Sequence, residues 1–170
     1  KRTSGFSGLV EPLPRSFHRV RAGEVFVIGG SRWEAVVGHG HSPEHLCLLN
    51  RERKLLLSGD QVIPLITPNV SVMAIEPEAN PLADWLESKR RFLALPDDVL
   101  VLPSHNECFR GLHARLDYLA ATQLRTLARL RKSLAEPKRA IDVFAALFAR
   151  AIGEGDAGLL NLATGESLAC

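Results

Sequence analysis

The segment Val36-Val37-Gly38-His39-Gly40-His41-Ser42-Pro43-Glu44-His45-Leu46 places three histidines within seven residues, between two apolar runs. The glycines on either side of His39 and the proline after Ser42 disfavour a continuous helix or strand, so a loop is predicted here. Imidazole is the commonest metal ligand among side chains, and several imidazoles on a loop at a strand end favour a metal site. Partners for such a site are expected at the ends of other strands.

Two further segments have the same form. Leu57-Ser58-Gly59-Asp60 and Leu102-Pro103-Ser104-His105-Asn106 each continue an apolar strand through small or stiff residues to a side chain that can bind a metal. Strand ends that meet at one edge of a sheet bring such side chains together. Asp60 could then bridge two metal ions, with His41 serving one ion and His105 the other. This pattern predicts a dinuclear site with catalytic roles for His41 and Asp60.

The first part of the chain is predicted to be rich in strands. Residues 24–28 and 32–37 alternate polar and apolar side chains around the turn Gly29-Gly30-Ser31, which predicts a hairpin. Short apolar runs predict strands at residues 46–49, 54–57 and 99–102. Asn80 and Pro81 provide an N-cap and a first-turn proline for a helix that ends near residue 95. Residues 1–19 are expected to be irregular and to cross the surface as a lid.

From Gly111 onward the sequence becomes helical. Leucines recur at helical spacing and predict a long helix that ends near Pro137, followed by helices over residues 137–151 and 159–170. These leucines are Leu112, Leu116, Leu119, Leu127, Leu130 and Leu134. The predicted fold class is therefore α+β or α/β. Its divisions are a β-rich part over residues 1–110, a linking helix over 111–136 and a helical segment over 137–170.

Composition excludes several classes of protein. The chain is 46% hydrophobic and 24% charged, with a net charge of +2, which is too small to argue for nucleic acid binding by itself. No apolar run is long enough to cross a membrane. Cys47, Cys108 and Cys170 are scattered, so free thiols in a reducing cytoplasm are expected.

Taken in order, the motifs at residues 40–45, 55–60 and 101–105 resemble the second half of the metallo-β-lactamase fold hydrolases. The resemblance implies half of an αββα sandwich and two zinc ions. It implies that His41 binds the first metal, Asp60 bridges both and His105 binds the second. The helix that begins at Pro81 is similar to a helix of the family, and residues 162–169 are similar to a winged-helix module that follows the catalytic domain in one branch.

The chain also departs from this family. The main metal motif, HxHxDH, is absent and is expected before Lys1, and Glu44 replaces a usual glycine. The winged-helix module stops at Cys170, before a wing. We therefore interpret the chain as the C-terminal part of a larger enzyme. By itself it is expected to bind metal weakly or not at all and to have no turnover, because its ligands are too few.

Other candidates have less support. His39 is expected to line a pocket mouth or to be exposed, and His45 to pack or hydrogen-bond beside a ligand. Cys108 could be a soft ligand or a nucleophile, but a buried structural thiol is favoured. Cys47 is assigned to the core, and His113 to a solvated or capping position.

The leading functional hypothesis is a metal-dependent hydrolase in which a metal-bound hydroxide attacks the carbonyl of a small-molecule ester or thioester. One alternative is an endoribonuclease of the same fold, and the other is a non-enzymatic binding or dimerisation module. A basic run could contact RNA, although a solvated helical face is favoured. Its members are Arg125, Arg129, Arg131, Lys132, Lys138 and Arg139. Homo-oligomer formation is left open.

Overall fold

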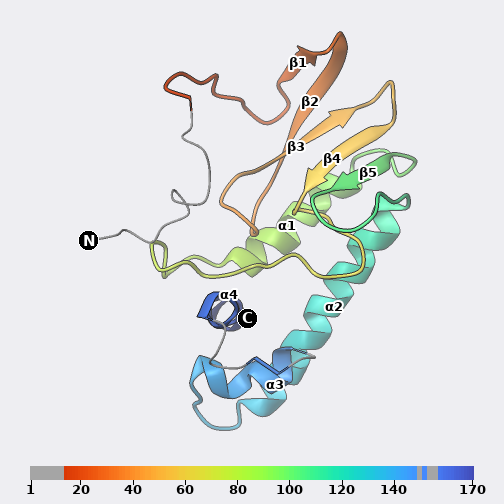
Figure 1. The fold of residues 1–170 in the computed structure, drawn as a ribbon. Helices are drawn as coiled ribbons and strands as arrows, with labels where there is room; N and C mark the ends of the chain where they lie inside the picture. The colour runs from red at the N-terminus through yellow and green to blue at the C-terminus, as the bar shows by residue number, and fades with distance from the viewer. Residues whose placement is uncertain (1–13, 149–150, 153–156) are drawn as a thin grey trace.

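A five-stranded sheet forms the upper part of the molecule in Figure 1. The computed structural model describes residues 14–148, 151–152 and 157–170. The strands lie side by side in chain order, and all neighbours are antiparallel except the last pair, β4 and β5. They are β1 (Val25–Ile28), β2 (Ser31–Gly38), β3 (His45–Asn50), β4 (Leu55–Gly59) and β5 (Leu100–Pro103). The predicted hairpin and the three predicted strands are confirmed.

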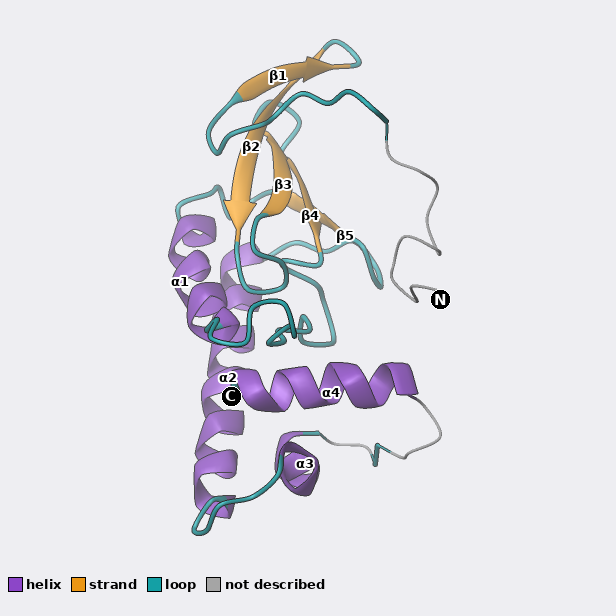
Figure 2. Ribbon diagram, turned by 90° about the vertical axis from the view of Figure 1, so that its left-hand side faces the viewer, coloured by secondary structure: helices purple, strands orange, loops and turns teal. Residues whose placement is uncertain are grey.

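The parallel pair β4 and β5 needs a crossover connection, and helix α1 (Pro81–Leu93) provides it. The Asn80 side chain accepts a hydrogen bond from the Ala83 backbone N–H at 3.1 Å, so the predicted cap is confirmed. Helix α1 lies beside the sheet (Figure 2) and buries Trp85 and Phe92 in the core. The sheet is thus covered on one side by helix, while the long segment before α1 runs below the strand ends.

Helix α2 (Leu112–Ser133) begins against the sheet and extends beyond it (Figure 1). Leu112, Leu116 and Leu119 are buried in the same core as α1 and the strands. The predicted long helix is confirmed, and Leu134, just beyond its end, is 44% exposed. Helix α2 is continuous through residue 133. The domain boundaries expected at residues 110 and 136 stay a prediction.

The predicted helix over residues 137–151 is shorter in the structure. Among the described residues of this range, a 3-10 turn covers Ala140–Val143 and α3 covers Phe144–Leu147, while residues 149–150 lie outside the description. Asp142 accepts hydrogen bonds from the backbone and the guanidinium of Arg139, which fixes the start of this turn three residues after Pro137. Leu130, Val143 and Leu147 form a second small core.

The third predicted helix is present as α4 (Ala157–Ala169), which crosses beneath the segment of residues 64–79 in Figure 2. Residues 14–19 are irregular as expected, whereas residues 1–13 and the predicted break at 153–156 lie outside the described parts. In those parts, no helix combines the length and apolar character needed to cross a membrane.

Candidate metal centre

The loops that carry the predicted ligands lie at the lower edge of the sheet in Figure 2. Strands β2, β4 and β5 all end at this edge, and β3 begins there, because β3 runs antiparallel to its neighbours. The loop between β2 and β3 carries His41, the turn after β4 carries Asp60, and the turn after β5 carries His105. Three segments that are far apart in sequence therefore contribute to one place.

Asp60 lies between the two histidines. Its Oδ2 is 3.4 Å from Nε2 of His41, and its Oδ1 is 3.3 Å from Nε2 of His105. His41 donates a hydrogen bond from Nδ1 to the carbonyl of Asn69 at 2.8 Å. This bond fixes the tautomer and leaves the lone pair of Nε2 directed toward the carboxylate, which is the state of a histidine that binds metal.

The carboxylate of Asp60 has unused acceptor capacity. Its Oδ1 is buried and has no hydrogen-bond partner among the described residues, since the approach of His105 is not aligned for a hydrogen bond. A buried oxygen of this kind is costly unless it is paired. One carboxylate between two imidazoles is a donor set that suits a divalent cation. Within the described ranges, no group of three or more His, Cys, Asp or Glu side chains is arranged so that it could hold a metal ion, so Asp60 and its two histidines do not form a complete site by themselves.

Two glycines shape the edge of the sheet. Gly40 has a φ of +99°, and a Cβ there would lie 2.5 Å from the backbone oxygen of Pro81 and from Cβ of Trp85. Helix α1 therefore packs directly on the histidine loop. Gly59 has a φ of +54° and turns the chain at the end of β4, so that Asp60 faces His41.

His45 supports the site from below His41. The two imidazole rings meet edge to face with centroids 5.4 Å apart, and Ser42 Oγ lies 3.4 Å from Nδ1 of His45. Burial lowers the pKa of His45, with the nearby His41 adding to the effect. His45 therefore packs beside a candidate ligand, as predicted.

His39 faces away from the carboxylate. Its Nδ1 donates to the carbonyl of Pro43 at 2.5 Å, and its Nε2 accepts from the guanidinium of Arg91 at 2.7 Å. Both ring nitrogens are occupied, so His39 is not available to a metal in this arrangement. It lines a separate surface hollow together with Arg91 and His18.

The prediction of a buried structural thiol at Cys108 is wrong. Cys108 is exposed, because it lies in the irregular segment after β5 rather than in a strand. Cys47 is fully buried in β3 as expected, and its burial raises the pKa of the thiol to about 12. His113 has a capping position, since Nε2 of its ring lies 2.9 Å from the carbonyl of Leu95, just past the end of α1.

All six members of the basic run are exposed, as a solvated face requires. Arg125 bonds to Thr122 and Arg129 to Thr126 on the same helix, and contact of this run with RNA stays a hypothesis.

Sequence reasoning missed Asn69 and Glu166. Asn69 holds His41 through its backbone carbonyl, and its side-chain amide donates to Oε2 of Glu166 on α4 at 3.1 Å. Burial raises the pKa of Glu166 to about 7. Asn69 belongs to no motif, and Glu166 lies in the segment of residues 162–169, to which no site role was assigned. The one available signal was a carboxylate, Glu166, in a mostly apolar helix.

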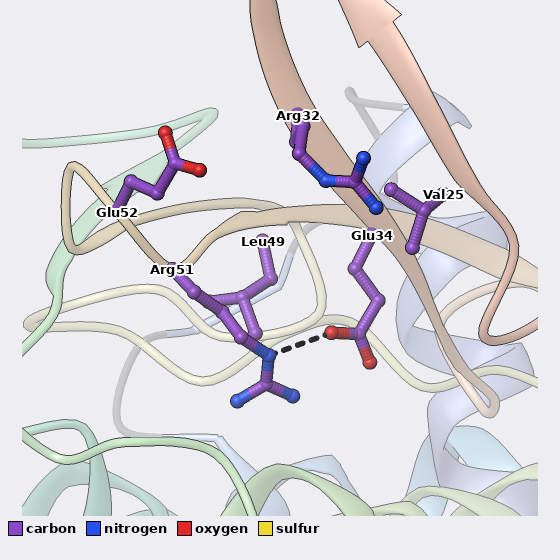
Figure 3. Close-up of a pocket in the computed structure, with 6 residues that line it drawn as sticks. All are labelled: Val25, Arg32, Glu34, Leu49, Arg51 and Glu52. Atoms are coloured by element: carbon purple, nitrogen blue, oxygen red, sulfur yellow. Dashed lines mark hydrogen bonds and ion pairs between the residues drawn. The ribbon is translucent and has the colours of Figure 1, made fainter.

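A different hollow lies at the opposite end of the sheet (Figure 3). It has a volume of about 260 Å³ and is crossed by the ion pair between Arg51 and Glu34 at 2.8 Å. None of the six residues that line it is a histidine or a cysteine. This hollow is therefore a poor candidate for a metal centre.

Comparison with known proteins identifies the superfamily of the chain. Residues 5–105 match the model of the Metallo-beta-lactamase superfamily, and the chain belongs to that superfamily. The mixed α and β fold is that of part of a metallo-β-lactamase domain, as predicted. The fold family implies a divalent metal ion, and the histidines and carboxylate described above are suited to one.

Particular relatives cover more of the chain. A beta-lactamase domain protein from Burkholderia ambifaria is 41% identical with a TM-score of 0.86, covering 96% of this chain and 48% of its own. A metallo-beta-lactamase family protein from Thermus thermophilus is 29% identical with a TM-score of 0.77, covering 92% and 48%. An Atrochrysone carboxyl ACP thioesterase from Aspergillus fumigatus is 28% identical over 116 residues, which are 68% of this chain and 25% of that protein. The chain therefore spans about half of the two solved structures and a quarter of the thioesterase.

Proposed function

We propose that the full-length protein is a metal-dependent hydrolase that cleaves a small-molecule ester or thioester. The observation that carries this proposal is the carboxylate of Asp60 between the Nε2 atoms of His41 and His105, at 3.4 and 3.3 Å. Membership of the superfamily supports a hydrolase, and the thioesterase among the relatives supports a carbonyl substrate. This proposal includes zinc as the metal and two metal ions in the complete site.

His41, Asp60 and His105 would hold the metal, with Asp60 shared between two ions. When bound, a divalent cation would lower the pKa of water and polarise the carbonyl of the substrate. His41 is oriented for this role because Asn69 holds the opposite ring nitrogen. The ring of His45 lies against His41 and close to Gly59, while the side chain of His105 is 63% exposed.

Hydrolysis adds water across the bond between the carbonyl carbon and its sulfur or oxygen. The carbon–oxygen bond to water forms, the bond to sulfur or oxygen breaks, and the leaving thiol or alcohol takes up a proton. The attacking water must lose a proton. That proton balances the one that the leaving thiol or alcohol takes up.

The test uses the full-length gene product and the thioester S-acetyl-N-acetylcysteamine. We expect His41→Ala and Asp60→Ala each to lower bound metal after dialysis and to lower hydrolysis by about a hundredfold or more, since even the supporting partners of ligands contribute 10- to 100-fold. His18→Ala is the matched control, because His18 is exposed and pairs with Glu24 away from the site. Full activity in both His41→Ala and Asp60→Ala would refute the proposal.

A further inference from the structure

The described residues leave a large pocket between the segment of residues 66–69 and helices α2, α3 and α4. Its volume is about 1000 Å³, which is at the upper end of the range for small-molecule sites. Apolar side chains of α3, of the residue just after it and of α4 form much of its wall, including Leu147, Phe148, Leu162 and Ala163. An apolar wall of this size favours a hydrophobic group rather than a polar metabolite.

The polar side chains that line the pocket come from the segment before α1 and from helices α2 and α4, and they are Thr67, Asn69, Thr122, Gln123, Thr126, Arg129 and Glu166. The guanidinium of Arg129 donates to the hydroxyl of Thr126 at 3.0 Å and to the carbonyl of Ala146 at 3.1 Å, so its charge is held by acceptors of the protein. Asn69 Nδ2 donates to Glu166, and Asn69 Oδ1 accepts from Ser71, so the amide is held in one orientation. Burial raises the pKa of Glu166 to about 7, so the part of the wall around Asn69 and Glu166 carries less negative charge than an exposed carboxylate would give it.

The pocket adjoins the candidate metal centre through one residue. Asn69 lines the pocket with its side chain, and its backbone carbonyl bonds to the ring of His41. Helix α4 lies directly below the segment that contains Asn69 (Figure 2). A molecule whose carbonyl reaches His41 and Asp60 could therefore extend its other end toward Leu162 and Glu166.

We propose that this pocket binds the medium-length, uncharged apolar acyl chain of the substrate, against Leu162 and Phe148. The inference rests on the proposed function, because it assigns one part of the substrate of that same site. Helices α3 and α4 would then determine which acyl groups are accepted, while the sheet edge carries the residues of hydrolysis.

Two matched substitutions on α4 test the assignment in the full-length gene product. Leu162 and Leu168 are 48% and 63% exposed, so tryptophan at either position should not unfold the helix. Leu162 lines the proposed acyl pocket, whereas Leu168 lines a different hollow. Leu162→Trp fills the pocket, and Leu168→Trp is its control.

The first measurement is the ratio of kcat/KM for S-octanoyl- and S-acetyl-N-acetylcysteamine. We expect a preference for the octanoyl thioester of about tenfold or more in the wild type, because its added methylenes are buried. Leu162→Trp should remove most of this preference, and Leu168→Trp should retain it. The absence of a preference in the wild type, or equal ratios in the two variants, would overturn the proposal.

The second measurement is independent of hydrolysis. Calorimetric titration with N-octylacetamide and N-methylacetamide, two neutral amides, reports binding even if no thioester is cleaved. Tighter binding of the octyl compound that Leu162→Trp weakens and Leu168→Trp does not supports the pocket, even where the hydrolase proposal fails. Equal binding of the two amides, or no effect of Leu162→Trp, refutes it and indicates that another part of the protein fills the space.

Discussion

Replacing Gly59 by alanine should destabilise the protein through two separable effects. The φ of +54° at Gly59 is left-handed, and an L-residue there costs about 1–2 kcal/mol. The new Cβ would also lie 2.4 Å from Nε2 of His45, so this ring must move. Moving it disrupts the edge-to-face contact with His41, worth about 1 kcal/mol. We therefore expect Gly59→Ala to lower the free energy of unfolding by about 2–3 kcal/mol.

The chain offers a control for the backbone effect alone. Gly111 has a φ of +86°, but a Cβ at that position would have nothing within 4 Å. Gly111→Ala should therefore cost only the backbone strain, about 1–2 kcal/mol. The steric part can also be removed from Gly59→Ala by combining it with His45→Ala, after which only the backbone cost should remain.

Urea unfolding of the wild type, the three single variants and the Gly59→Ala/His45→Ala double variant measures both effects. We expect a coupling energy of about 1 kcal/mol between positions 59 and 45, which is within the range that such cycles resolve. Additive changes at the two positions, with Gly59→Ala no more costly than Gly111→Ala, would refute the steric argument.

Three further outcomes follow from the described side chains. A thiol reagent at neutral pH should modify exposed Cys108 rapidly and leave Cys47 unmodified in the folded protein, because Cys47 is buried and burial raises its pKa to about 12. Mass spectrometry of tryptic peptides measures the modification at each cysteine. The pKa of Glu166 rises on folding from about 4.5 to about 7, so the folded state binds the extra proton. Stability from this group is complete below about pH 4.5 and is lost as the pH rises through about 7, and Glu166→Gln should flatten that part of the pH–stability curve. Gly165→Ala places a Cβ 2.8 Å from the backbone oxygen of Val72, so α4 must shift, and we expect a loss of about 1–3 kcal/mol in thermal unfolding.

Much of the fold could be predicted because its signals are local. The alternation around Gly29-Gly30 and the Asn80-Pro81 helix start each involve neighbours in sequence, and both appear in the structure. The convergence of His41, Asp60 and His105 is not local. It was expected from strand ends and from resemblance to a family, and the structure places these side chains next to one another. Their role as metal ligands stays a prediction.

The misses come from tertiary context. Cys108 is an apolar-type residue in a chain segment that leaves the sheet after β5, and sequence does not show where that segment goes. His39 lines a surface hollow, which agrees with its expected place at a pocket mouth, but its partner could not be predicted. Arg91, 52 residues later on α1, occupies its Nε2. No spacing rule relates these two positions.

The contacts of α4 argue against treating the helical segment as an independent module. The backbone N–H of Val72 donates to the carbonyl of Gly165 at 3.0 Å, and Glu166 accepts from Asn69 at 3.1 Å. Asn69 in turn fixes the ring of His41. Any displacement of α4 thus reaches a candidate metal ligand through a single residue. The orientation of His41 therefore depends on α4, whose Glu166 is 125 residues away in sequence. Removing residues 137–170 should weaken metal binding, even though every candidate metal ligand of this chain would remain.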